Sequence, residues 1–156
     1  MKEGLSPMAI VDSETIERSI RIEARPETVF SFFTDPQKMV MWKGILASLD
    51  PQPGGLYRVE ISQRDIVRGE FIELEPYSRI VFTWGWEGED SPLPPGSSLV
   101  EIDLAEDHGA TLLRLRHLGL PQAVKASHIE GWDHFLPRLA AAAEGRNLGP
   151  DPWSMT

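Results

Sequence analysis

His117 is the residue that this sequence places best, by type and by position, to do chemistry. It ends the alternating segment Ala110–His117 and by that alternation lies on the same face as Leu113 and Leu115. An imidazole that points into a cavity could orient a ligand carbonyl or act as a general acid or base. The alternative interpretation is a structural histidine that is hydrogen-bonded to a neighbour.

His128 and Trp132 form a second candidate pair, four residues apart in an apolar pattern that predicts a helix over 123–143. This spacing puts both side chains on one face of the helix. The pair would either project into a cavity or pack the helix against the rest of the fold. The histidines lack metal-ligand spacing and the sequence has no HExxH motif, so we expect no metal site.

Composition and missing motifs exclude several classes of function. There are no cysteines, which removes disulfides and thiolate chemistry. No GxSxG, GxGxxG or phosphate-loop motif occurs, so we expect no nucleotide or other cofactor. A net charge of −9 disfavours nucleic acid and anionic membranes. With no membrane-spanning apolar run and no signal-peptide pattern, the sequence predicts a cytoplasmic protein.

The elements that must position these residues follow from periodicity and turn signals. Arg25-Pro26 and Asp35-Pro36 predict the starts of two short helices, and Pro137 predicts a kink or a division of the long last helix. The expected strands are 15–22, 47–52, 56–62, 66–75, 79–86, 98–106 and 110–117. Strands that follow one another, next to segregated helices, indicate an α+β fold with an antiparallel sheet.

The chain reads as one domain over 14–144, preceded by a flexible arm over 1–13 and followed by an irregular tail over 145–156. Trp153 in that tail is a candidate to dock back onto the domain. The acidic, Pro- and Gly-rich segment 87–96 is expected to be a mobile loop, too polar to bury, that gates a pocket and disfavours anionic ligands.

A long helix lying across a curved sheet should leave a cavity that aromatic residues line. Gly69 in strand 66–75 would leave room there for a ligand or form a bulge. Ordinary core packing is the alternative for every member of the expected lining. The expected ligand-binding residues are Phe33, Trp42, Tyr57, Phe71, Trp84, His117, His128 and Trp132.

Several segments together carry a family resemblance. They are Ala24–Phe30 with Thr34-Asp35-Pro36 and Trp42, Pro53-Gly54-Gly55, Gly69–Pro76, Arg79–Trp84, Gly109–Leu115 and His128–Trp132 with Leu136 and Leu139. In order and spacing the chain resembles the START-like, birch-pollen-allergen-like (SRPBCC) superfamily. Within it, the chain is most similar to the activator of heat-shock protein 90 ATPase homologues of the single-domain bacterial type. The resemblance implies a helix-grip fold, in which about seven antiparallel strands wrap around the C-terminal helix.

The resemblance leaves three classes of function open. The first is the binding of a small aromatic, acyl or lipid-like ligand between the sheet and the last helix, with little or no catalysis. The second is a cyclase, dehydratase or hydrolase of a small aromatic substrate, with His117 as the acid or base. The third is a stress-response co-chaperone that stimulates a heat-shock protein 90 type ATPase. A homodimer is a further open alternative.

Overall fold

A computed structural model describes residues 15–155; the expected arm over 1–13 lies outside the described residues. The elements in chain order are β1 Ile16–Ile22, α2 Pro26–Thr34, α3 Pro36–Met39, β2 Leu46–Leu49, β3 Leu56–Glu60, β4 Ile66–Glu75, β5 Arg79–Trp84, β6 Ser98–Asp107, β7 Ala110–Leu118, α4 Gln122–Ala143 and the 3-10 helix η1 Pro152–Met155. Asp35 begins α3 as its N-cap, because its side chain accepts hydrogen bonds from the backbone of Gln37 and Lys38.

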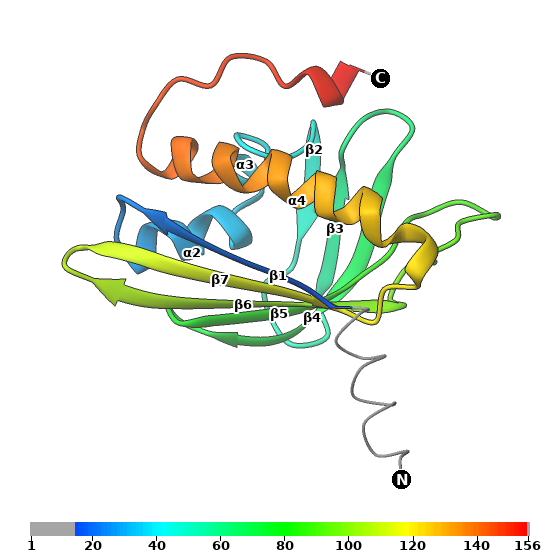
Figure 1. The fold of residues 1–156 in the computed structure, drawn as a ribbon, viewed down its shortest axis with the longest axis horizontal. Helices are drawn as coiled ribbons and strands as arrows, with labels where there is room; N and C mark the ends of the chain where they lie inside the picture. Colours follow the sequence, from blue (N-terminus) through cyan, green and yellow to red (C-terminus); the bar gives the residue numbers. More distant parts are fainter. Residues whose placement is uncertain (1–14, 156) are drawn as a thin grey trace, which may run out of the picture.

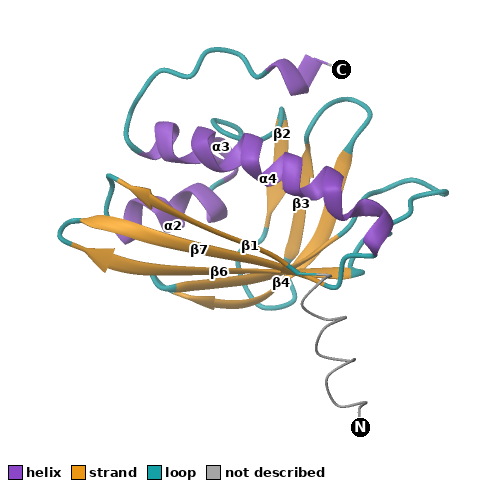
Figure 2. Ribbon diagram, viewed as in Figure 1, coloured by secondary structure: helices purple, strands orange, loops and turns teal. Residues whose placement is uncertain are grey.

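The seven strands form one antiparallel sheet in the order β1-β7-β6-β5-β4-β3-β2. The sheet bends around α4, which crosses its concave face, while α2 and α3 close one end (Figures 1 and 2). This is the α+β helix-grip fold that the sequence predicts. The tail after α4 turns back and runs along the side of α4 that faces away from the sheet (Figure 1).

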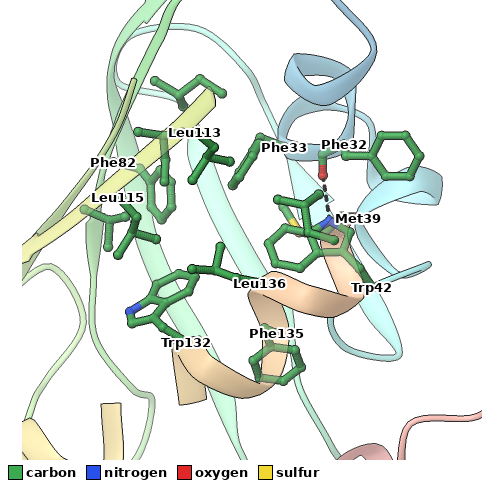
Figure 3. Close-up of a cluster of buried hydrophobic side chains, with 14 of the residues drawn as sticks. Phe32, Phe33, Met39, Trp42, Phe82, Leu113, Leu115, Trp132, Phe135 and Leu136 are labelled. Atoms are coloured by element: carbon green, nitrogen blue, oxygen red, sulfur yellow. Dashed lines mark hydrogen bonds between the residues drawn. The ribbon is translucent and has the colours of Figure 1, made fainter. Parts of the chain in front are cut away.

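The interior between sheet and helix is filled by apolar side chains. In Figure 3, Trp132 and Leu136 of α4 face Phe82, Leu113 and Leu115 of the sheet. All five are 5% exposed or less. A tightly packed interior leaves little room for a large central cavity.

The structure refines three local predictions. Most of the segment 87–96 is exposed, as expected, but Leu93 is 2% exposed and its carbonyl accepts a hydrogen bond from the backbone of Trp86, so the loop is anchored at this residue. Of the two effects expected of Pro137, division does not occur, because α4 runs through it as one helix. Gly69 leaves no room for a ligand, because a Cβ there would lie 2.0 Å from the carbonyl oxygen of Thr83 on the neighbouring strand β5.

Candidate functional site

A groove of about 270 Å³ opens between the middle of α4, the end of β5 and the tail. Apolar and aromatic side chains make most of its wall, and Gly131 of α4 forms part of the opening. Its lining residues are Ile61, Asp65, Trp84, Trp86, Ser127, His128, Gly131, Trp132, Phe135 and Trp153. Because nothing lies within 4 Å of a Cβ built on Gly131, this glycine leaves the groove wider than any other residue would.

The tail supplies the outer wall of this groove. The Trp153 indole stacks on the His134 ring with 3.9 Å between ring centroids and meets Phe135 edge-on at 5.5 Å. Asp151 fixes the tail in place, since its buried carboxylate lies 2.9 Å from His134 Nε2 and accepts a hydrogen bond from the Trp153 backbone. The docking of Trp153 that the sequence suggests is therefore observed.

His117 lies behind the groove, and both of its ring nitrogens take part in a continuous series of hydrogen bonds. Trp132 Nε1 donates to His117 Nδ1 at 3.0 Å, so this nitrogen is the acceptor. Ser98 Oγ donates to the Trp84 carbonyl at 2.8 Å, so it must accept its second bond, at 2.9 Å, from His117 Nε2. The network assigns a neutral imidazole with its proton on Nε2, and both ring nitrogens are engaged.

His128 is neutral as well, in the opposite tautomer. Trp86 Nε1 donates to His128 Nε2 at 3.0 Å, and His128 Nδ1 donates to the Val124 carbonyl at 2.7 Å. The two imidazoles lie edge to face with their centroids 5.4 Å apart. Burial, together with the repulsion that a protonated His117 would meet from protonated His128 or Lys43, holds the pKa of His117 well below its ordinary value. Burial also lowers the pKa of His128.

Lys43 is the residue of this region that the sequence did not indicate. Its side chain is 1% exposed and ends among four aromatic rings, those of Trp42, Tyr57, Trp84 and Trp132, at 4.6 to 5.6 Å from Nζ. Nζ lies 2.9 Å from Tyr57 Oη, its hydrogen-bond partner. Burial lowers the pKa of Lys43 to about 7 and raises the pKa of Tyr57 far above its ordinary value.

The eight residues expected to bind a ligand divide into two groups. Trp84, His128 and Trp132 line the groove. The other five, Phe33, Trp42, Tyr57, Phe71 and His117, are fully buried with no exposed surface. The two groups are continuous, since Trp84 contacts both Tyr57 and His117 through its ring.

Sequence reasoning missed Phe135 and Gly131 as lining residues, as well as Lys43 and Ser98 behind them. Alternation along 79–86 places Trp86 on the face of Trp84, and in the structure Trp86 lines the groove just beyond the end of β5, where it pairs with Val67. Helical spacing could have added Phe135, which follows His128 by seven residues. No sequence pattern distinguishes a buried lysine in a loop from an exposed one.

Within residues 15–155, no group of three or more His, Asp or Glu side chains gathers as a metal would need. None of the helices in this range is long and apolar enough to cross a membrane.

Comparisons with known proteins agree on one family. The model of the family "Activator of Hsp90 ATPase homolog 1-like protein" matches residues 23–144. The AHSA1-like protein of Rhizobium etli, solved by NMR, is 47% identical, with 91% of this chain and 89% of that chain covered and a TM-score of 0.71. A search of the curated proteins finds no match.

Two further solved structures are similar. DynU16, a putative protein in the dynemicin biosynthetic locus, is 26% identical over 86% of this chain and 49% of that chain, with a TM-score of 0.73. An HSP90 activator from Plasmodium falciparum is 24% identical over 81% of this chain and 93% of that chain, with a TM-score of 0.67; at this identity the likeness shows the fold alone. From the match over residues 23–144, the chain belongs to the family of activator of Hsp90 ATPase homolog 1-like proteins.

Proposed function

We propose that this protein binds one small apolar, predominantly aromatic ligand in the groove between α4, the end of β5 and the tail. The observation that carries the proposal is the wall of the groove. Four tryptophans line it together with Gly131, namely Trp84, Trp86, Trp132 and Trp153. Concave sites with mostly apolar walls and a few fixed polar groups are typical of small-molecule binding.

The size of the groove supports a small ligand. Its volume of about 270 Å³ is near the lower end of the ligand pockets of proteins, which begin at about 300 Å³, and suits a molecule of about two fused rings. Burial of that apolar area, at about 25 cal/mol per Å², would supply the affinity. The occurrence of DynU16 in a biosynthetic locus agrees with a small organic ligand.

The other two functions have less support from this site. Proton transfer by His117 needs a free ring nitrogen, and both of its nitrogens are engaged with Ser98 and Trp132. The similarity to the Plasmodium activator shows a shared fold and gives no support for a shared protein partner. Ligand binding in the cytoplasm is therefore the function that we put forward.

The test uses Gly131, where a side chain can be added without a clash inside the protein. The probe is N-phenyl-1-naphthylamine, a neutral aromatic dye that becomes fluorescent in apolar surroundings. We expect saturable binding by the unmodified protein and at least tenfold weaker binding by Gly131→Phe, because the phenyl ring would occupy the groove. Gly131→Ala is the matched control and should change the affinity by less than about twofold. Equal affinities for Gly131→Phe and the unmodified protein would overturn the proposal.

A further inference from the structure

Lys43 is a buried amine without a counter-charge. Among the described residues, its nitrogen is bonded only to the neutral hydroxyl of Tyr57 and otherwise faces aromatic rings, and burial is the cause of its lowered pKa. Buried charges in proteins are usually paired, because an unpaired one loses its hydration without an equivalent gain. The interior thus contains an ammonium group with which an anionic ligand could form an ion pair.

Trp84 carries a second unused donor beside this amine. Its Nε1 is buried and has no hydrogen-bond partner within residues 15–155. The indoles of Trp42, Trp86 and Trp132, in contrast, donate to the Phe32 carbonyl, His128 and His117, respectively. An unsatisfied buried N–H costs free energy, so its presence in a packed interior needs an explanation.

Lys43 and Trp84 are in contact, and Trp84 reaches the groove. Lys43 Nζ lies over the Trp84 ring, 4.6 Å from its centroid, and Trp84 itself lines the groove. We infer that the groove takes an apolar ligand that ends in an anionic oxygen, a carboxylate or a phenolate, and that Lys43 and Trp84 Nε1 receive this oxygen. The inference rests on the proposed function, since it names the class of ligand for the same groove.

Trp84 is the part of the wall that yields to the ligand. Trp132, whose ring lies beside that of Trp84 with 5.2 Å between centroids, is held by its hydrogen bond to His117, which in turn is bonded to Ser98. The Trp84 indole has no such bond, so its rotation would break no hydrogen bond, and binding of the anionic oxygen requires that this rotation opens a path from the groove to Nζ. In the rotated position its N–H can turn toward the ligand oxygen.

Charge in and around the groove orients the ligand. Asp65 is the acidic residue of the lining and is exposed at the rim, where it repels an anionic group toward the inner end. In the acidic loop, Glu87 is paired with Arg58 and Arg68, whereas Glu89 and Asp90 are exposed to solvent, which screens their charge. The groups that face Lys43 are Tyr57, which stays protonated, and His117, which stays neutral.

Binding must then change the protonation of Lys43. Burial lowers the pKa of this amine to about 7 in the free protein, so the amine is partly neutral at pH 7. A carboxylate that binds as an anion favours the ammonium, and the protein therefore takes up protons when this ligand binds at pH 7. A phenol that enters in its neutral form transfers its proton to the amine where the amine is neutral, and releases it to solvent where the amine is already charged, so its binding takes up no proton and releases a fraction of one.

The experiment compares 2-naphthoate with 2-naphthalenemethanol, which has the same ring system and no charge, and adds 2-naphthol as the phenol. Affinities come from quenching of tryptophan fluorescence and from calorimetry at pH 7 in two buffers of different ionisation enthalpy. We expect at least one of the two acids to bind at least tenfold more tightly than the alcohol. Net proton uptake accompanies naphthoate alone, which distinguishes the carboxylate from the phenol.

Two variants assign the effect to the two donors. Lys43→Met keeps the length of the side chain and should abolish the preference for the acid while the alcohol binds as before. Trp84→Phe keeps a ring and removes the N–H, and should lower the preference about threefold to tenfold. Gly131→Phe should weaken all three ligands together.

The outcomes separate the two proposals. If the alcohol binds in the groove and neither acid is preferred, or if Lys43→Met keeps the preference, the anionic ligand is refuted and the groove remains a binding site. If Gly131→Phe leaves the affinity for every ligand unchanged, the proposed function fails. The proton uptake is measured on the unmodified protein, so it tests for a bound carboxylate even if Lys43→Met does not fold.

Discussion

At the residue scale, Lys43 sets a destabilising charge in the middle of the protein. In the unfolded chain its pKa is about 10.5, and in the folded protein burial lowers the pKa to about 7. Between these pH values the unfolded state binds more protons than the folded state. The free energy of unfolding therefore increases as the pH rises from about 7 toward 10.5. We expect Lys43→Met to stabilise the protein at pH 7 by about 1–4 kcal/mol.

The stability gained by Lys43→Met relative to the unmodified protein should decrease as the pH rises. Urea unfolding of both proteins from about pH 7 to about pH 9 measures this difference. Tyr57 loses its partner in the variant, which offsets part of the gain. Lys125→Met is the matched control, because Lys125 lies on α4 and is only partly buried. A Lys43→Met variant whose stability relative to the unmodified protein is constant over this range contradicts the argument.

Lys43 also shows where sequence reasoning stops at this scale. Lysine is among the residues that are almost never fully buried, and Trp42-Lys43-Gly44 has no periodicity that would mark it. His117, His128 and Trp132 could be identified because alternation and helical spacing give their faces. The tautomers and partners of the histidines could not, since they depend on Ser98 and Trp86 from strands that are distant in sequence.

At the scale of elements, two glycines of similar appearance in sequence have opposite roles. Gly69 is pressed against β5, where a Cβ would lie 2.0 Å from the Thr83 carbonyl oxygen, while Gly131 faces open space on α4. We expect Gly69→Ala to destabilise the protein by about 1–3 kcal/mol or more, because the strands must separate. Gly131→Ala should stabilise it by about 0.5–1 kcal/mol, since alanine favours the helix.

Chemical denaturation of both variants is the measurement. The two changes add the same methyl group, so they control for each other. A Gly69→Ala variant as stable as the unmodified protein would mean that the strands β4 and β5 tolerate a wider spacing than the structure shows.

The tail is a second element whose role can be tested. Trp153 stacks on His134 and lines the groove, whereas Met155 on the same short helix is 73% exposed. We expect Trp153→Ala to cost about 0.5–1.5 kcal/mol and to speed release of N-phenyl-1-naphthylamine in stopped-flow experiments, because the outer wall is lost. Met155→Ala should change neither. Identical release rates for the two variants would show that the tail does not close the groove.

The elements themselves could largely be predicted, because strand alternation and the Pro26 and Pro36 helix starts are local signals. The position of the groove could not. Sequence patterns assign side chains to the inner face of the sheet, but how far α4 fills that face depends on the fit of side chains such as Leu136 and Phe82. Because the centre is packed, the groove opens near Trp84, Gly131 and the tail instead.

At the scale of the whole molecule, the two buried neutral histidines make the free energy of unfolding decrease at acidic pH. Burial lowers the pKa of both His117 and His128 below the ordinary value of 6.5. Below that pH the unfolded chain binds protons that the folded protein does not, so stability is complete above about pH 6.5 and is lost as the pH falls. Protonation would also turn the acceptor nitrogens toward Trp132 and Trp86 into donors and break both bonds.

We therefore expect the urea midpoint of the protein to fall steadily between about pH 6.5 and about pH 5, before the carboxylates begin to titrate. His128→Gln should flatten part of this slope, because the amide can still accept the Trp86 hydrogen bond and cannot titrate. His108→Gln is the control, since the His108 side chain is 92% exposed. A midpoint that stays constant to pH 5 would show that the histidines are protonated in the folded state, which their hydrogen bonds to the two indoles do not allow.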